Sequence, residues 1–169
     1  YAGLVKSTWK NVVEQKTEKD YGITRYSDTG GVMFKYKVTK NLGQGSPTRL
    51  GTIGNGDLYK FPLTPGKTWT YVNRWVTGKG ESGYDEITYS VVEQETLTTK
   101  AGTFDVVKVK GSGRWFNETA KTEDGMEMIL YYSPQVQTTV RVDRVQQMPA
   151  AWRVPPTRER TDLVAYELK

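Results

Sequence analysis

Alternation of apolar and polar residues is the main pattern along this chain, and it predicts β-strands. The pattern is cleanest between Val32 and Lys40, where every second residue is apolar. Its apolar positions are Val32, Phe34, Tyr36 and Val38. Successive side chains of a strand point to opposite faces, so this segment is expected to bury one face and to leave the other largely in water.

A second alternating segment, Phe61–Thr77, organises the rest of the sequence. It opens with a turn containing Pro and Gly and continues as a strand rich in aromatic residues. One face of that strand carries Trp69, Tyr71, Asn73 and Trp75. Three large aromatic side chains on one face have to be covered, either by the protein core or by a ligand.

Further strands are expected on both sides of this segment. The candidates are Tyr21–Tyr26, Tyr84–Thr98, Phe104–Lys110, Arg114–Asn117, Met126–Tyr132, Thr138–Val145 and Leu163–Leu168. The turn signals between them are Ser27–Gly31, Thr99–Thr103 and Glu123–Gly125. Short connections between successive strands favour an antiparallel meander.

Three segments do not follow the simple strand pattern. Leu4–Lys16 fits one face of a helix and also alternates as a strand would, and both interpretations stay open. The glycine-rich stretch Asn41–Asp57 predicts a long loop or an irregular sheet edge. Pro149–Arg160 contains paired prolines, which donate no ladder hydrogen bond, so a loop or an extended crossing is expected there.

The predicted fold class is therefore all-β. We expect residues 1–169 to form a single domain of mainly antiparallel strands, curved into a half-barrel or a sandwich, with at most one short helix near the amino terminus. Residues 1–57 are expected to form a lead-in, and residues 58–169 a β-meander.

Composition narrows the possible chemistry. The chain has no Cys and no His, which excludes disulfides, nucleophilic triads that need imidazole, and histidine metal ligands; no metal or other cofactor is expected. The net charge of +5 is scattered among acidic residues, so binding of nucleic acid is disfavoured. No apolar run reaches the length of a transmembrane helix, and a start at Tyr1 suggests a trimmed amino terminus.

Carboxylates are the one catalytic chemistry that the composition allows freely. Three pairs lie close in sequence: Glu93 with Glu95, Asp85 with Glu86, and Glu123 with Asp124. Glycoside hydrolysis needs two carboxyl groups facing each other across a sugar. Solvated acids on open strands are the simpler interpretation, and the group Glu123, Asp124 and Glu127 lacks the spacing of a known calcium loop.

Aromatic side chains are better candidates for a binding site, because exposed rings stack on sugars or line apolar cavities. The candidate ligand-binding residues are Trp69, Tyr71, Trp75, Trp115, Tyr132 and Trp152. For Trp69 and Tyr71 a place in the sheet core is the favoured alternative. Trp152 lies in the proline-containing segment and is the best candidate for an exposed contact residue.

Several motifs together resemble the TapB-like envelope domains of unknown function in bacteria. The motifs are Leu63-x-x-Gly66-x-x-Trp69-x-Tyr71, Val91-Val92-Glu93-x-Glu95-Thr96, Thr99-x-Ala101-Gly102-Thr103-Phe104-Asp105-x-x-Lys108, Tyr131-Tyr132-Ser133-Pro134-Gln135-Val136 and a closing strand from Thr161 to Tyr166. The resemblance covers about residues 57–169, and the amino-terminal part departs from it. It implies an exported, often lipoprotein-type β domain with no assigned activity, located in the periplasm or the outer envelope.

The leading hypothesis is accordingly a non-enzymatic envelope module that binds or assembles. It would hold an apolar ligand, a glycan or a protein partner on a concave aromatic face. The alternative is a glycan-acting hydrolase that depends on two carboxylates.

Overall fold

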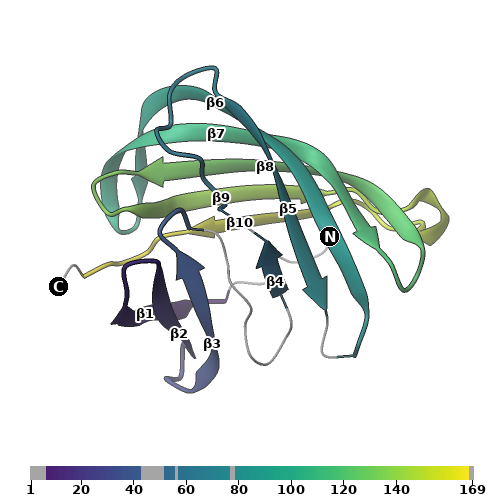
Figure 1. Cartoon of the computed structure of the whole chain (residues 1–169), viewed down its shortest axis with the longest axis horizontal. Helices are drawn as coiled ribbons and strands as arrows, with labels where there is room; N and C mark the ends of the chain where they lie inside the picture. Colours follow the sequence, from purple (N-terminus) through teal and green to yellow (C-terminus); the bar gives the residue numbers. More distant parts are fainter. Residues whose placement is uncertain (1–6, 43–51, 56, 77–78, 168–169) are drawn as a thin grey trace.

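The computed structural model of the chain consists of two antiparallel β-sheets (Figure 1), and it describes residues 7–42, 52–55, 57–76 and 79–167, without the side chains of Phe34 and of residues 52–55. The small sheet contains β1 (Trp9–Lys16), β2 (Asp20–Ser27) and β3 (Val32–Thr39). The large sheet contains β4 (Thr52–Asn55), β5 (Thr68–Val76), β6 (Ser82–Thr99), β7 (Gly102–Asn117), β8 (Thr122–Ser133), β9 (Thr138–Gln146) and β10 (Thr157–Asp162). In both sheets the strands pair in the order in which they occur along the chain.

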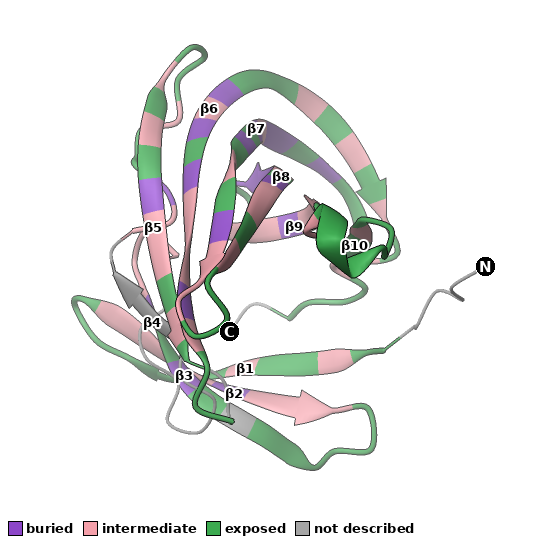
Figure 2. Cartoon of the chain, turned by 90° about the vertical axis from the view of Figure 1, so that its right-hand side faces the viewer, coloured by how far each residue is buried: buried purple, intermediate pink, exposed green. Residues whose placement is uncertain are grey.

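The predicted all-β fold class is confirmed, and the large sheet forms an open half-barrel. Every strand pair is antiparallel, and the order runs from β10 at one edge to β4 at the other without closing. Seen end-on, strands β5 to β10 form an arc, and the small sheet lies across its open side (Figure 2). No helix in the described part of the chain is both long enough and apolar enough to cross a membrane.

The amino-terminal segment is a strand, which settles the choice between helix and strand for its described residues. Trp9 to Lys16 pairs with β2, while Leu4 lies outside the described residues. The guanidinium of Arg25 lies 4.9 Å from the Trp9 ring and 5.6 Å from the Tyr36 ring, so one face of the small sheet is held by cation–π contacts. The sequence left the helix open because a short amphipathic run can fit both the period of a helix and that of a strand.

Strand β7 corrects the prediction of two separate strands, Phe104–Lys110 and Arg114–Asn117. The glycines between them do not interrupt the ladder, because β7 pairs continuously with β8 from Val107 to Asn117. Gly111 instead leaves room for an aromatic ring: a Cβ atom there would lie 2.4 Å from Cε1 of Tyr89. What resembles a break in the sequence is a place where a ring lies flat on the sheet.

The carboxyl-terminal strand also differs from the prediction. Leu163–Leu168 was expected to form it, yet β10 is Thr157–Asp162, residues 163–167 form no strand, and Leu168 lies outside the described residues. The expected loop Pro149–Arg160 contains a 3-10 turn at Ala150–Trp152 and the first part of β10. An apolar pattern could not reveal β10, since this edge strand is joined to β9 by ion pairs, Arg160 with Asp143 and Arg141 with Asp162.

Three smaller expectations are also revised. The turn between β7 and β8 lies at residues 118–121, so Asp124 and Gly125 belong to strand β8 instead. The glycine-rich segment contains the edge strand β4, although residues 43–51 and 56 lie outside the described residues. Tyr36 and Val38 are buried as expected, but Val32 is 58% exposed because it begins its strand at the end of the hairpin.

Candidate ligand-binding site

The inner face of the large sheet collects most of the predicted site residues. Residues directly opposite each other in antiparallel strands point to the same side, so the pairing register defines this face. One row across four strands runs through Asn73, Asp85, Trp115 and Asp124, and a second row runs through Tyr89, Gly111, Met128 and Arg144. The two ends of the face differ in what covers them.

One end of the inner face, which we call the closed end, is filled by the segment from Leu58 to Leu63. Tyr59 is fully buried, shares a hydrogen bond of 2.7 Å with Thr139, and its ring centroid lies 5.2 Å from that of Tyr132. The indole N–H of Trp69 donates to the carbonyl of Leu58 at 3.0 Å. Burial also raises the pKa of Tyr89, which lies stacked at 5.7 Å from Trp69. The closed end is thus a packed core.

The other end, which we call the open end, contains a polar cluster of Asn73, Asp85 and Arg144 around Trp75. Oδ1 of Asp85 accepts a hydrogen bond of 3.2 Å from Nε1 of Trp75, and Oδ2 accepts one of 3.4 Å from Nδ2 of Asn73. Nη2 of Arg144 donates to Oε1 of Gln146 at 2.7 Å, and Nη1 of Arg144 lies 3.5 Å from Oε2 of Glu159 on β10. A carboxylate, an amide and a guanidinium are therefore gathered on a face that is aromatic elsewhere.

Burial sets the electrostatics of the open end. Desolvation raises the pKa of Asp85, although the hydrogen bond from Asn73, the positive charge of Arg144 and the hydrogen bond from Trp75 each act in the opposite direction. Burial is also the main cause that raises the pKa of Tyr71 to about 12, and the negative charge of Asp85 adds to it. Asp85 is thus an acidic group held in a poorly hydrated place.

Two polar atoms of this cluster have no hydrogen-bond partner among the described residues. They are Oδ1 of Asn73 and Nε of Arg144, and both are shielded from bulk water. An unpaired buried donor or acceptor costs about 1–3 kcal/mol. Because natural cores rarely leave such groups unpaired, the hydrogen bonding of the open end is incomplete.

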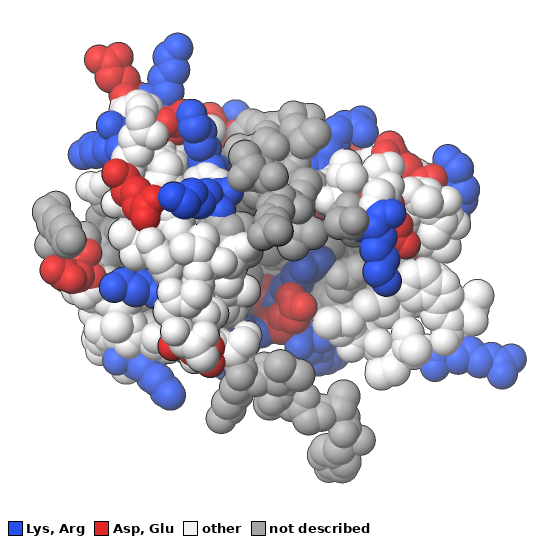
Figure 3. Space-filling view, turned by 90° about the horizontal axis from the view of Figure 1, so that it is seen from below, with Lys and Arg blue, Asp and Glu red and all other residues white. Residues whose placement is uncertain are grey.

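Two further tryptophans border the open end. The indole N–H of Trp115 donates to the carbonyl of Gln147 at 2.9 Å, and its ring centroid lies 6.0 Å from that of Trp152. Trp115 is 5% exposed, whereas Trp152, on the 3-10 turn, is 46% exposed. The underside of the molecule is hollowed between two lobes, with acidic and basic side chains visible inside the hollow (Figure 3).

The outer face of the same sheet carries most of the acids that the sequence suggested for catalysis. Nζ of Lys108 lies 3.0 Å from Oε1 of Glu93 and 3.0 Å from Oε2 of Glu95, and these contacts raise the pKa of Lys108. Asp85 and Glu86 are neighbours in one strand and so point to opposite faces, and the same holds for Glu123 and Asp124. None of the three sequence pairs forms two carboxyl groups facing each other over a cleft.

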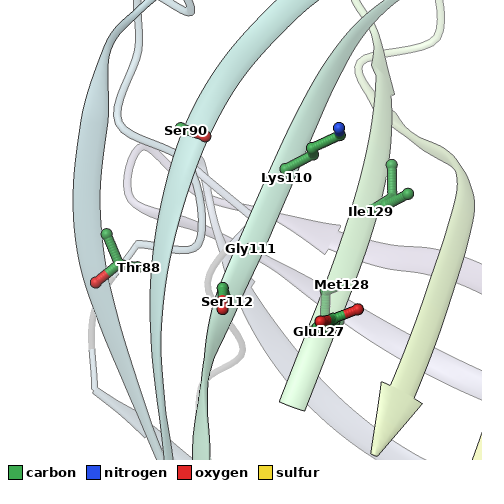
Figure 4. Close-up of a pocket in the computed structure, with 8 residues that line it drawn as sticks. All are labelled: Thr88, Ser90, Lys110, Gly111, Ser112, Glu127, Met128 and Ile129. Carbon is green, nitrogen blue, oxygen red and sulfur yellow. The ribbon is translucent and has the colours of Figure 1, made fainter. Parts of the chain in front are cut away.

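A shallow depression of about 380 Å³ also lies on the outer face (Figure 4). It is lined by eight residues of β6, β7 and β8, which are Thr88, Ser90, Lys110, Gly111, Ser112, Glu127, Met128 and Ile129. Thr88 already shares a hydrogen bond with Thr70 at 3.1 Å. The depression is wide and open, and its polar groups do not converge on one point, so it is the weaker candidate site.

The structure places four of the six predicted aromatic site residues in or against one buried cluster. Tyr71, Trp115 and Tyr132 belong to that cluster and Trp69 packs against it. Trp75 lies at the open end, and Trp152 lies beside Trp115 at its border.

Sequence reasoning missed Asn73 and Arg144 and considered Asp85 only as one of a pair with Glu86. A signal for Asn73 was present, because Asn73 interrupts a strand face that is otherwise aromatic.

Metal binding has no support in the described part of the chain. No three acidic side chains there lie close enough together to hold a metal ion. Glu123 and Glu127 project from the outer face of β8 while Asp124 projects from the inner face, so the acidic group noted in the sequence is split by the strand.

Comparison with known proteins shows the fold and no more. A candidate lipoprotein from Parabacteroides distasonis ATCC 8503 has a similar structure, with a TM-score of 0.57, 16% identity, and coverage of 96% of this chain and 88% of its own. The hypothetical lipoprotein YmcC from Escherichia coli (K12) aligns with a TM-score of 0.51 and 13% identity over 94% of this chain and 78% of its own. No protein-family model and no curated protein matches the sequence.

Proposed function

We propose that this chain is a non-catalytic binding module of the bacterial cell envelope that holds its ligand at the open end of the inner face. The observation that carries the proposal is the cluster of Asn73, Asp85 and Arg144, with unpaired polar atoms, beside Trp75. The closed end of the same face shows that this fold can fill its interior with aromatic residues. Polar groups with incomplete hydrogen bonding at the open end are therefore better explained by binding than by packing.

Two observations support the envelope location. Both solved structures of similar fold are described as lipoproteins, and the motifs between residues 57 and 169 resemble those of the TapB-like envelope domains. Cell fractionation of the organism that makes the protein tests this part. Recovery in the membrane or periplasmic fraction is expected, and recovery in the cytoplasm alone would contradict it.

Binding at the open end is tested by substituting Trp75. Because the indole N–H of Trp75 contacts Asp85, ligand binding nearby should change tryptophan fluorescence. We expect Trp75→Phe to weaken binding of whichever probe the protein takes: a neutral oligosaccharide, an acidic oligosaccharide or an apolar dye. Trp9→Phe, on the small sheet, is the matched control and should bind as the unsubstituted protein does. Equal binding by both variants would contradict the proposed site.

One observation favours a second candidate function, carboxylate-dependent glycan hydrolysis. A half-buried acid with a raised pKa suits a general acid, and Asp85 is such a group. Asp124 lies on the same inner face, with Trp115 between the two. Release of reducing ends from neutral polysaccharides, lost in both Asp85→Asn and Asp124→Asn, would support hydrolysis. Absence of turnover in the unsubstituted protein would remove it.

A further inference from the structure

The geometry points to a neutral sugar unit of a glycan as the ligand of the open end, recognised by Asn73, Asp85 and Arg144 and stacked on tryptophan. This inference rests on the proposed function and narrows it from three ligand classes to one. The hydrogen-bonding groups, the charges and the rings at that end each support it.

The polar cluster offers both acceptors and donors. Oδ1 of Asn73 and the remaining lone pairs of Asp85 can accept, while Nε of Arg144 can donate. Since Oδ1 of Asn73 and Nε of Arg144 are shielded from solvent, a ligand reaches them only if these two side chains turn outward. A sugar hydroxyl both donates and accepts, so adjacent hydroxyls can satisfy a carboxylate and a guanidinium at the same time. An apolar ligand would leave these groups unpaired at a cost in affinity.

The charges argue against an anionic ligand. Nη1 of Arg144 lies 3.5 Å from Oε2 of Glu159, so the positive charge of Arg144 is already paired. Asp85 is hydrogen-bonded by the neutral side chains of Trp75 and Asn73, and its negative charge would repel an anion. A neutral sugar is therefore favoured over a uronic acid.

The rings supply the stacking surface that sugar binding needs. Trp75 lies directly over Gly83, where a Cβ atom would be 2.3 Å from Cζ2 of the indole, so glycine is required beneath the ring. The ring is also fixed by the hydrogen bond of its N–H to Asp85. Trp152, 46% exposed and beside Trp115, provides a second aromatic surface at the rim. Rigid rings bordering a small polar cluster are the arrangement expected for a pyranose.

The test is a titration of the folded chain with defined probes, followed by tryptophan fluorescence and calorimetry. The probes are the neutral oligosaccharides cellopentaose, maltopentaose and chitopentaose, the acidic pentagalacturonate, and the uncharged apolar dye N-phenyl-1-naphthylamine. We expect at least one neutral oligosaccharide to bind. Asp85→Asn and Arg144→Gln should each weaken that binding by at least about tenfold, because each removes a hydrogen bond to a charged group.

Matched controls separate the site from general charge effects. Asp105→Asn changes an exposed carboxylate near the hairpin end of β7, and Arg158→Gln changes an exposed cation on β10. Both should bind like the unsubstituted chain, and circular dichroism with thermal melting checks that every variant folds.

The outcomes distinguish this inference from the proposed function. Binding of only the acidic oligosaccharide or the dye, weakened by Trp75→Phe, would overturn the neutral sugar and leave the binding module in place. Neutral-sugar binding that Asp85→Asn and Arg144→Gln leave unchanged would overturn the assigned residues. If no probe binds in a manner that depends on Trp75, both this inference and the proposed function fail.

Discussion

The two ends of the inner face are built by the same strands and by the same alternation, yet one is a core and the other a candidate site. At the closed end, the ring of Tyr59 packs against that of Tyr132 on the sheet, and its hydroxyl is paired with Thr139. At the open end, Asp85 is half-buried and its neighbours retain unpaired polar atoms. The residue at each register position, together with the segment that covers it, decides which outcome results.

The difference teaches that aromatic content alone does not mark a binding face in this fold. Trp69 and Trp75 occupy the same face of one strand, and the indole N–H of each is bonded within the protein. The acceptor differs: a backbone carbonyl for Trp69, and a carboxylate for Trp75. A carboxylate costs much more to desolvate than a carbonyl, so its retention at the open end requires a reason other than stability.

The largest expected effect is a cavity at the closed end. Leu130 is 1% exposed, and Leu130→Ala should lower the free energy of unfolding by about 3 kcal/mol, through lost burial and a residual cavity. Trp152→Ala at the open end should lower it by no more than about 1 kcal/mol, since its side chain is partly in water. Urea unfolding measures both. Equal losses would mean that the two ends are packed alike.

Adding a methyl group at a glycine gives a second, somewhat smaller contrast in stability between two positions of the sheet. Gly111→Ala places a methyl group 2.4 Å from Cε1 of Tyr89 and should cost about 2 kcal/mol as the ring is forced to move. At Gly125 the nearest atom would be Cγ of Gln147 at 3.4 Å, so Gly125→Ala should stay within about 0.5 kcal/mol of the unsubstituted protein. Thermal melting compares the two. A well-tolerated Gly111→Ala would show that Tyr89 does not lie tightly against the sheet.

Alternation explains how much of this arrangement could be predicted from the sequence. It correctly placed Trp69, Tyr71, Asn73 and Trp75 on one face, because the period of a strand is a local property. It could not show which part of that face is covered. The cover at the closed end comes from Leu58 and Tyr59, whose position depends on contacts with strands far along the chain.

The polar cluster was beyond sequence reasoning for a similar reason. Asp85 and Arg144 belong to strands that are three apart in the sheet, and only the pairing register shows that they share a face. The sequence pointed instead to pairs of adjacent acids, although neighbouring residues in a strand point to opposite sides. Strand β10 was missed because its side chains are mostly polar and form ion pairs with β9, such as Arg160 with Asp143, so they leave no apolar signature.

A smaller effect is expected from one hydroxyl at the closed end. Tyr59→Phe keeps the buried ring and removes the hydrogen bond of 2.7 Å to Thr139, so the free energy of unfolding should fall by about 1 kcal/mol. Tyr166→Phe is the matched control, because Tyr166 is 44% exposed, and it should change stability little. If Tyr59→Phe were neutral, the covering segment would be held by ring packing alone.

The smallest effect has the opposite sign and depends on pH. Because burial raises the pKa of Asp85 in the folded state, the charged carboxylate destabilises the fold at neutral pH, and Asp85→Asn should stabilise it by roughly 0.5 kcal/mol. As the pH falls through the raised folded-state pKa, the unsubstituted protein takes up a proton and the advantage of Asp85→Asn shrinks. It should largely vanish by about pH 3, where Asp is mostly protonated in both states.

Thermal melts at pH 7 and at about pH 3 measure this difference, with Asp105→Asn as a control that should show no such pH dependence. If Asp85 is retained for binding, Asp85→Asn should be more stable and should also bind sugar more weakly. If Asp85→Asn instead lowers stability at pH 7, the carboxylate serves mainly to anchor Trp75 and Asn73. The open end would then be a packed core like the closed end, and the contrast between the two ends would no longer hold.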